Sequence, residues 1–334
     1  MLDHAHAALS RRRLLTLTGA GAAAGAGLLA APGPLLAKGP MGLPQAPYFY
    51  RFKLGDAEAT VVSDGQLPLG DPNTFLVGMP REEIARRLLD NFLPDNATLE
   101  QNVLVVNFGG QRTVLFDLGM GTSKVFGEGQ GRLLANLRAA GIDPASIDAL
   151  VMSHAHIDHC GGIMAADGSR NYPNAQLYIA QSDFEYWTSE DKVPANAPGR
   201  AAFIKQARDN LLPNRDRTVF FKDGQEFLPG VTALAAPGHT VGHTIFHIQS
   251  GNQQLCYIGD LAHHPVLLLE RPRTQFIYDT DPPQSAETRV RLMTMLAEKR
   301  IPILAYHFAW PGVGNVAKVG DGFRYFPQAM QMVL

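Results

Sequence analysis

The chain has 334 residues, 46% hydrophobic and 18% charged, which is typical of a globular protein with a substantial core. A formal net charge of −2 gives no reason to expect binding to nucleic acid or to an anionic membrane surface. The two cysteines, Cys160 and Cys256, are too few for a disulfide scaffold, and each is interpreted as a small buried hydrophobic residue.

The N-terminal residues have the pattern of an export signal. Residues 10–15, Ser-Arg-Arg-Arg-Leu-Leu, resemble the twin-arginine motif and precede a Gly/Ala-rich, weakly apolar run. We therefore expect a signal peptide over residues 1–37, a linker over 38–47 and a periplasmic or secreted mature protein without stable membrane contact. An uncleaved membrane anchor is the alternative, because the run over residues 14–31 approaches the length of a bilayer-spanning helix.

The first predicted elements carry no chemical signature. Residues 48–62 alternate and turn as a β-hairpin does. We expect residues 63–101 to be irregular, apart from one helix with Pro80 in its first turn and Ile84, Leu88 and Leu89 on one face. That segment could cover a cleft or form the contact of a homodimer.

The rest of the chain alternates strands and helices within one domain, residues 48–334. Strands over residues 102–108 and 113–116 form a second hairpin. Further strands are expected at about 150–152, 175–180, 254–258 and, as the last one, 301–306. Helices are expected at about 130–140, from a cap at Ser182 through Trp187, at 200–212 and at 285–299. This order predicts an α/β (α+β) fold of two packed sheets with helices outside.

Residues 150–162, Leu-Val-Met-Ser-His-Ala-His-Ile-Asp-His-Cys-Gly-Gly, carry the strongest chemical pattern. The apolar start predicts the end of a buried strand, and the two glycines should let the backbone turn. Residues two apart in an extended segment point the same way, so His154 and His156 can bind one ion. Asp158 and His159 lie past the bend and can face a second ion. Imidazole and carboxylate ligands without thiolate suit zinc, with manganese, iron or cobalt as alternatives.

Other polar residues stand where apolar strands stop. These are Asp117, His239, Asp260 and His307. His239 is the candidate third ligand for the first ion, and His307 is a candidate partner for the second. Asp260 can bridge both ions, because a carboxylate has two oxygens.

Together these motifs resemble the metallo-β-lactamase superfamily, and over residues 48–327 they are most similar to methyl parathion hydrolase and its lactonase relatives. The resemblance implies a four-layer αββα sandwich with a dinuclear site between the sheets. It assigns His154, His156 and His239 to one metal. It assigns Asp158, His159 and His307 to the other, with Asp260 bridging.

The same resemblance implies an aromatic pocket for an aryl or apolar leaving group. By local match, Phe126, Trp187 and Phe203 take those places, and Phe308 and Trp310 follow a ligand closely enough to join them. Acyl-homoserine lactonases of this superfamily carry a Tyr three residues after the bridging Asp. This chain has His263 at that position.

Three histidines outside the ligand set have separate interpretations. His263 could polarise a substrate carbonyl or protonate a leaving group, since imidazole titrates near neutrality; the alternative is a solvated loop histidine. His243 is expected to orient a ligand by a hydrogen bond, and His247 to be structural.

The sequence thus predicts a dinuclear zinc hydrolase in which Asp158, Asp260 and His263 serve catalysis. Two ions roughly 3.5–4 Å apart would share a bridging hydroxide that attacks a small-molecule lactone, aryl ester or phosphotriester, and Asp158 could relay a proton. β-Lactams are less expected, because zinc β-lactamases usually carry Cys or Ser where Asp260 stands. Alternatives are an iron-dependent redox enzyme such as a sulfur dioxygenase, an acyl-homoserine lactonase, and a non-catalytic metal-binding protein.

Overall fold

The computed structural model describes residues 48–332, which fall within one compact unit. The predicted signal peptide (1–37) and linker (38–47) lie outside the described residues. Within residues 48–332, no helix combines the length and apolar character that a bilayer crossing requires.

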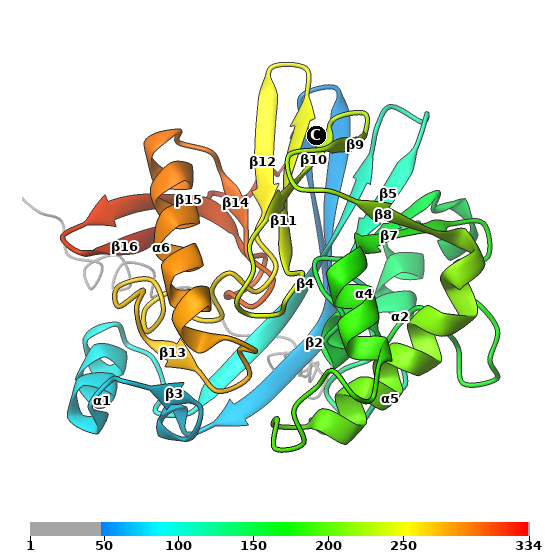
Figure 1. The fold of residues 1–334 in the computed structure, drawn as a ribbon. Coiled ribbons are helices and arrows are strands. Elements are labelled where there is room, and N and C mark those ends of the chain that lie inside the picture. The colour runs from blue at the N-terminus through cyan, green and yellow to red at the C-terminus, as the bar shows by residue number, and fades with distance from the viewer. Residues whose placement is uncertain (1–47, 333–334) are drawn as a thin grey trace, which may run out of the picture. The chain divides into compact units, whose positions relative to one another are not determined.

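Two seven-stranded sheets face each other, with helices on both outer faces (Figure 1). The first sheet has the order β1 (Phe49–Leu54), β2 (Ala57–Gly70), β4 (Ala97–Asn107), β5 (Thr113–Phe116), β6 (Ala149–Val151), β7 (Gln176–Ala180) and β8 (Thr218–Phe221). The second has the order β16 (Gly322–Pro327), β15 (Val313–Val319), β14 (Ile303–Leu304), β12 (Gln253–Tyr257), β11 (Thr244–Ser250), β10 (Val231–Ala235) and β9 (Glu226–Leu228).

The helices divide between the two outer faces. On the first sheet lie α2 (Leu133–Ala139), α4 (Gln181–Thr188) and α5 (Arg200–Leu211), and on the second lies α6 (Pro282–Glu298). Beside α6 a small ribbon pairs β3 (Leu76–Val77) with β13 (Gln275–Phe276), next to α1 (Arg81–Asp90). The single turn α3 (Ile157–Cys160) follows β6. This is the predicted αββα sandwich, which is confirmed.

The core between the sheets explains why the strands are so apolar. Val103, Leu104, Val105 and Val106 of β4 are all buried, because one face of this strand meets the opposite sheet and the other meets helices. Phe116 packs against Phe246 and Tyr257 from the other sheet, with ring centroids 5.6 Å apart in both pairs. Burial of such a side chain contributes about 1.5–3 kcal/mol, so this layer fixes how the two sheets sit on each other.

Strand direction gathers the polar strand ends at one edge. β5 and β6 pair in parallel, as do β12 and β14, so their carboxyl ends point the same way within each sheet. β10 and β12 are both antiparallel to β11, so β10 also ends at that edge. Asp117, His154, His239, Asp260 and His307 follow these five strand ends, and the sandwich therefore carries them all to one end of the interface.

Several predicted boundaries were wrong. Residues 63–101 are not mainly irregular, because β2 continues to Gly70 and β4 begins at Ala97, where the two strands pair antiparallel. In α1, Ile84 and Leu88 are buried as predicted, but Leu89 is 75% exposed. The predicted last strand is only two residues long, and the β15–β16 hairpin follows it.

The proposed cap of the helix that carries Trp187 was also wrong. Ser182 lies inside the first turn of α4, whose N-cap is Ala180 without a side-chain hydrogen bond. The interpretation of the cysteines is confirmed, because Cys160 and Cys256 are both buried free thiols, and burial raises the pKa of each.

A buried carboxylate ties the loop after β5 to the first sheet. Asp64 in β2 is fully buried and accepts hydrogen bonds from the backbone N–H groups of Met120 (2.8 Å), Gly131 (3.1 Å) and Leu133 (2.8 Å). Gly119 is required beside it, since a Cβ atom at that position would come within 2.3 Å of the Asp64 carboxyl carbon. The start of α2 and the loop that follows Asp117 are thereby held by one side chain.

We expect Asp64→Asn to destabilise the fold, because the amide nitrogen cannot accept the hydrogen bonds that one carboxylate oxygen now receives. Leaving a buried N–H without an acceptor costs about 1–3 kcal/mol. That loss lowers Tm by roughly 2–4 °C for each kcal/mol in a chain of this size. Calorimetry on both proteins measures it. Asp143→Asn is the matched control, since Asn caps a turn as well as Asp143 now does, and an equal loss there would contradict the explanation.

Candidate metal centre

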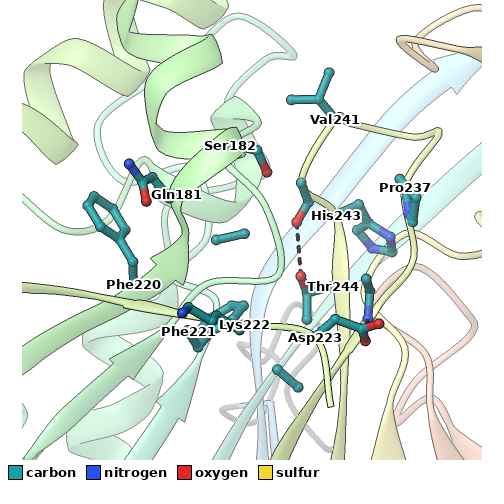
Figure 2. A pocket seen from close by; sticks show the side chains of 14 residues that line it. Gln181, Ser182, Phe220, Phe221, Lys222, Asp223, Pro237, Val241, His243 and Thr244 are labelled. Carbon is teal, nitrogen blue, oxygen red and sulfur yellow. Dashed lines mark hydrogen bonds between the residues drawn. The ribbon is translucent and has the colours of Figure 1, made fainter. Parts of the chain in front are cut away.

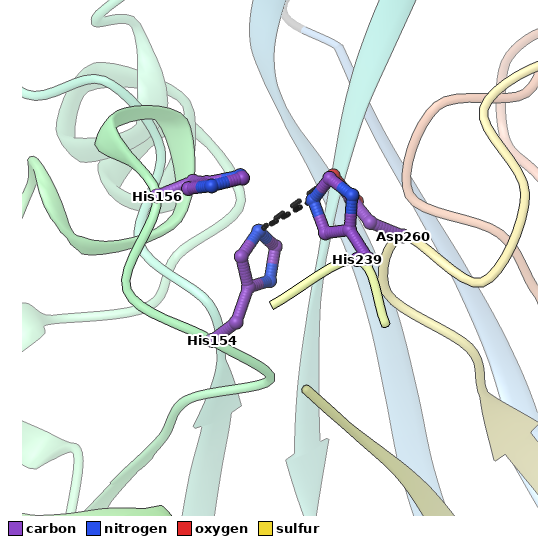
Figure 3. Close-up of side chains that lie close together, drawn as sticks. All are labelled: His154, His156, His239 and Asp260. Carbon is purple, nitrogen blue, oxygen red and sulfur yellow. Dashed lines mark hydrogen bonds and ion pairs between the residues drawn. The ribbon is translucent and has the colours of Figure 1, made fainter. Parts of the chain in front are cut away.

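Seven potential ligands lie together in two adjoining groups at the sandwich edge. In the first group the donor atoms of His154, His156, His239 and Asp260 all lie within 4.8 Å of one another (Figure 3). In the second group Asp158, His159 and His307 meet the same limit. The structure therefore brings together all seven residues that the sequence marked as ligands, in the two predicted sets.

Asp260 stands between the two groups with one oxygen directed to each. Its Oδ2 lies 3.1 Å from His239 Nε2 and 3.7 Å from His154 Nε2. Its Oδ1 lies 3.2 Å from His159 Nε2 and 3.3 Å from His307 Nε2. A carboxylate in this position could bridge two ions, one in each group.

The local fold of residues 150–162 differs from the predicted turn. β6 ends at Val151, His154 and His156 lie in the following loop, and Asp158 and His159 occupy α3. Gly161 has a φ of −64°, so it is not needed for its conformational freedom. It is needed for close packing, because a Cβ atom there would lie 2.3 Å from the Met120 carbonyl oxygen, and one at Gly162 would lie 2.0 Å from that of Leu118.

Hydrogen bonds to Nδ1 orient the imidazoles. His159 Nδ1 lies 2.8 Å from Asp117 Oδ2, His239 Nδ1 lies 2.7 Å from Asp279 Oδ1, and His307 Nδ1 lies 2.8 Å from the Glu100 carbonyl oxygen. A carboxylate or carbonyl oxygen can only accept, so each Nδ1 carries the proton. Each Nε2 then directs its lone pair to the centre, as metal ligation by histidine requires.

Asp117 organises the next layer around these ligands. It has a left-handed backbone (φ 57°), is fully buried, and accepts hydrogen bonds from Ser153 Oγ (2.6 Å) and Tyr257 Oη (2.8 Å) besides the one from His159. Because Ser153 Oγ donates to Asp117, it accepts from His154 Nδ1 at 2.9 Å. One carboxylate thus orients a ligand of each group.

The protein atoms alone leave this cluster unsatisfied. Among the described residues, His156 Nε2, His159 Nε2 and Asp260 Oδ1 are buried without a hydrogen-bond partner. A buried polar atom in that state costs about 1–3 kcal/mol. Burial also holds the pKa of His154 and His156 well below its usual value, so both imidazoles are neutral, the form that binds metal. The donor set of imidazole and carboxylate fits two zinc ions.

The centre opens onto an apolar hollow. The residues that line it are mainly aliphatic and aromatic: Leu67, Leu69, Leu99, Phe126, Phe203, Phe276 and Tyr278, together with His156, Asp158, His239, Asp260, His263 and His307. Phe126 and Phe203, two of the residues expected in the pocket, thus lie on the wall of this hollow. Trp187 lies behind it, edge-on to the His156 ring at 4.8 Å between centroids.

Two of the pocket candidates lie outside this hollow. Phe308 is fully buried in the core beneath α6, where it packs edge-on against Tyr325, 5.1 Å away. Trp310 packs against Tyr48 at 5.7 Å. Proximity in sequence to His307 misled here, because the chain leaves the site directly after that ligand.

The remaining histidines have distinct surroundings. His263 lines the hollow, its Nε2 lies 3.0 Å from Asp260 Oδ2, and burial lowers its pKa to about 4. It is therefore buried rather than solvated. His243 accepts a hydrogen bond from the Asp260 backbone N–H at 3.0 Å, in agreement with its predicted orienting role. His247 bonds Gln254 within the second sheet.

A second hollow, of about 280 Å³, lies where the ends of β7 and β8 face β10 and the loop before β11 (Figure 2). Gln181, Ser182, Phe220, Lys222 and Val241 are among its lining residues. It contacts His243 but none of the seven ligands, so substrate chemistry belongs to the apolar hollow.

Residues 97–305 match the family model of the metallo-beta-lactamase superfamily. The chain belongs to this superfamily. The structure superposes on that of AidC, a dizinc quorum-quenching lactonase in complex with a homoserine product, with a TM-score of 0.78, 28% identity, and coverage of 85% of this chain and 98% of the other. The hydrolase AbOPH gives a TM-score of 0.79, 26% identity, and coverage of 86% and 100%.

Curated relatives match over shorter stretches. An N-acyl homoserine lactonase, AttM of Azorhizobium caulinodans, is 29% identical over 119 residues, which is 35% of this chain and 41% of the relative. The N-acyl homoserine lactonase of Bacillus cereus is 28% identical over 154 residues, or 41% of this chain and 54% of the relative. The chain thus matches about half the length of these curated relatives or less.

Some residues that support the metal centre were not predicted from the sequence, because they are not part of a recognisable motif. Asp183 in α4 accepts hydrogen bonds from Ala155 N (2.6 Å) and Gly242 N (3.0 Å), and so ties together the two loops that carry the three histidines of the first group. Tyr306 donates to the Asp158 carbonyl oxygen at 2.7 Å. Asp279 stands just before a helix, where an acidic residue is ordinarily interpreted as a cap.

We expect the purified protein to hold two zinc ions per chain and His307→Ala to hold about one. His307 belongs to the second group and also lies near Asp260 and His263, but it is not part of the first group, whose donors stay complete without it. Mass spectrometry of the metal content after dialysis measures both numbers. Replacing His247 by Ala is the matched control and should leave two ions bound. Two tightly held ions in His307→Ala would contradict the ligand assignment.

Proposed function

We propose that this protein is a dinuclear zinc hydrolase whose substrates are neutral lactones and aryl esters. The observation that carries the proposal is the position of the bridging carboxylate. Asp260 joins two complete ligand groups and also lines the apolar hollow, so an ester in that hollow would lie directly against both metal sites.

The charge of the hollow favours neutral substrates. Of the residues that line it, Asp158 and Asp260 carry the charged side chains, and neither Lys nor Arg is among them. A substrate carboxylate would therefore meet no cation of the protein beyond the metal sites. This supports the preference for lactones over β-lactams, whose carboxylate calls for a basic partner.

The relatives support the same choice. AidC is described as a dizinc lactonase with a homoserine product, and the curated relatives are named N-acyl homoserine lactonases. We propose that ring-opening of lactones is shared with them. The aromatic lining of the hollow by Phe126, Phe203, Phe276 and Tyr278 extends the proposal to aryl lactones and aryl esters.

When bound, two zinc ions would polarise the ester carbonyl and lower the pKa of water to near neutrality. The chain's own groups supply the rest. The apolar wall holds the substrate and excludes bulk water. Asp158, whose Oδ2 faces His159 and His307 and which lines the hollow, can take the proton released as water adds to the acyl carbon. The ring C–O bond breaks, and the departing oxygen receives that proton.

We propose that His263 acts mainly by holding Asp260. At 3.0 Å its Nε2–H can donate to Oδ2 of that carboxylate, which leaves Nδ1 as an acceptor. In this arrangement the imidazole has no second donor for a substrate carbonyl. The role first expected for it, polarisation of the carbonyl, would need the ring to turn away from Asp260.

A phosphotriesterase is the second candidate, favoured by the aromatic wall, because a phenolate leaving group packs on rings and needs little acid assistance. The two candidates can be separated by kcat/KM of the zinc-loaded protein on N-hexanoyl-homoserine lactone, dihydrocoumarin and methyl parathion. We expect one of the lactones to exceed methyl parathion by roughly a hundredfold or more.

Asp260→Ala is the negative control for that comparison and should have no measurable turnover while its fold persists by circular dichroism. A preference for methyl parathion would make the phosphotriesterase the better assignment. No turnover of any of the three, with two zinc ions bound, would overturn the hydrolase proposal in favour of a redox or binding role.

The hollow predicts that Phe126→Ala weakens binding of an aryl lactone. Phe126 is half-buried on the wall, and loss of its apolar contact costs about 1.5–3 kcal/mol, which corresponds to roughly a tenfold to hundredfold rise in KM. Phe108→Ala is the matched control, since Phe108 is equally half-buried but lies at the far end of the β4–β5 hairpin. Equal effects of the two substitutions would remove Phe126 from the pocket.

A further inference from the structure

The start of α6 holds the loop that carries His239. Thr288 Oγ1 donates to the Pro237 carbonyl oxygen at 2.8 Å, and the Thr280 N–H donates to that of His239 at 2.8 Å. At Gly238, which has a φ of 127°, a Cβ atom would lie 2.2 Å from the Ser285 nitrogen. The backbone of this ligand loop is therefore packed directly against the helix, and α6 can transmit its position to the metal centre.

The side chain of Asp279 also contacts the His239 loop. Asp279 has no exposed side-chain surface, and its Oδ1 accepts the Nδ1–H of His239 at 2.7 Å. Its other oxygen, Oδ2, is buried without a hydrogen-bond partner among the described residues. The nearest cation is Arg289, with Nη2 3.8 Å from that oxygen. A buried carboxylate with an unbonded oxygen depends on such a charge.

Arg289 is itself fully buried in the middle of α6 and is bonded on every side. Nε donates to the Leu261 carbonyl oxygen at 2.8 Å, and Nη1 donates to those of Pro272 (2.8 Å) and Thr274 (2.9 Å). Nη2 bonds Ser285 Oγ at 3.3 Å. Leu261 directly follows the bridging ligand. The same guanidinium therefore faces the carboxylate that orients His239 and grips the segment that carries Asp260.

The three carbonyl groups need N–H donors, which an apolar side chain would not supply, but they do not need a charge. Burial of a guanidinium is costly unless it is hydrogen-bonded and also paired with an opposite charge. Arg289 is paired with Asp279, and Asp279 is hydrogen-bonded to the ligand His239.

We infer that Arg289 and Asp279 are a pair of positioning residues for the zinc centre. Asp279 fixes the ring of His239 with its Nε2 toward the ion, and Arg289 holds Asp279 charged and in place while it anchors the chain after Asp260. Two ligands of the first group, His239 and Asp260, are thus set by one buried ion pair. The inference concerns metal binding, and it holds for any substrate of the centre.

The test is the zinc affinity of purified, folded protein, measured by competition with a chromophoric chelator. Binding of the two zinc ions is resolved as two steps. We expect Asp279→Asn and Arg289→Met each to weaken the zinc affinity of one step by about 10–100-fold, the range for loss of an orienting partner. The affinity of the other step should change little. Arg291→Met is the matched control. Arg291 lies two residues further on α6 and is exposed, so its variant should bind zinc as the parent does.

The double variant shows whether Arg289 acts through Asp279. If it does, Arg289→Met should add little to the loss already present in Asp279→Asn. The visible spectrum of the cobalt-loaded protein gives a second readout, and both single variants should shift it because the geometry at His239 changes. Full additivity of the two losses, or an unchanged spectrum, would overturn the pairing.

A merely structural role predicts another result. Arg289→Met would then lower Tm without changing zinc affinity, and that outcome would overturn the inference. If Arg289→Met does not fold, Arg289→Lys replaces it. Lys keeps the charge but cannot reproduce the three-carbonyl fork, so we expect a loss of about threefold, and an unchanged affinity in this variant and in Asp279→Asn would equally overturn the inference. This test measures zinc affinity and not turnover. A failure of the proposed hydrolase activity would therefore be distinguishable from a failure of this inference.

Discussion

The whole structure depends on gathering five imidazoles and two carboxylates in one buried space. Away from water, metal-ligating atoms that lack a hydrogen-bond partner are costly, and three of these atoms have no partner within residues 48–332. Cations bound between these ligands would remove that cost. The two-sheet interface therefore holds the ligands as well as burying apolar surface.

The ligands come from segments far apart in the chain, so their geometry needs a frame beyond the strand ends. That frame is a layer of buried hydrogen-bond acceptors. Asp117 orients His159 and, through Ser153, His154, while the Glu100 carbonyl oxygen orients His307. Each acceptor is fixed because its backbone lies in a strand or beside one. The rigid sheets therefore fix the orientation of the imidazole rings at the metal centre.

The sequence predicted the sandwich and all seven candidate ligands, because both follow from local patterns. Apolar runs that stop abruptly at His154, Asp260 and His307 mark buried strands ending at a polar site. Long-range packing was not predictable in the same way. Phe308 stands next to a ligand in sequence but enters the core under α6, and Gly161 serves close packing with a loop forty residues earlier rather than a turn.

The supporting residues were missed for the same reason. Asp279 and Arg289 lie where an acidic residue before a helix and a basic residue within it are ordinary, and only the tertiary fold shows that both are buried and face each other. A charged residue in the interior of an amphipathic helix is informative once its burial is known. In this chain Arg289 binds three carbonyl groups and faces the carboxylate beside His239, so its burial is explained by tertiary contacts rather than by the helix itself, and one of these contacts leads to a ligand of the metal centre.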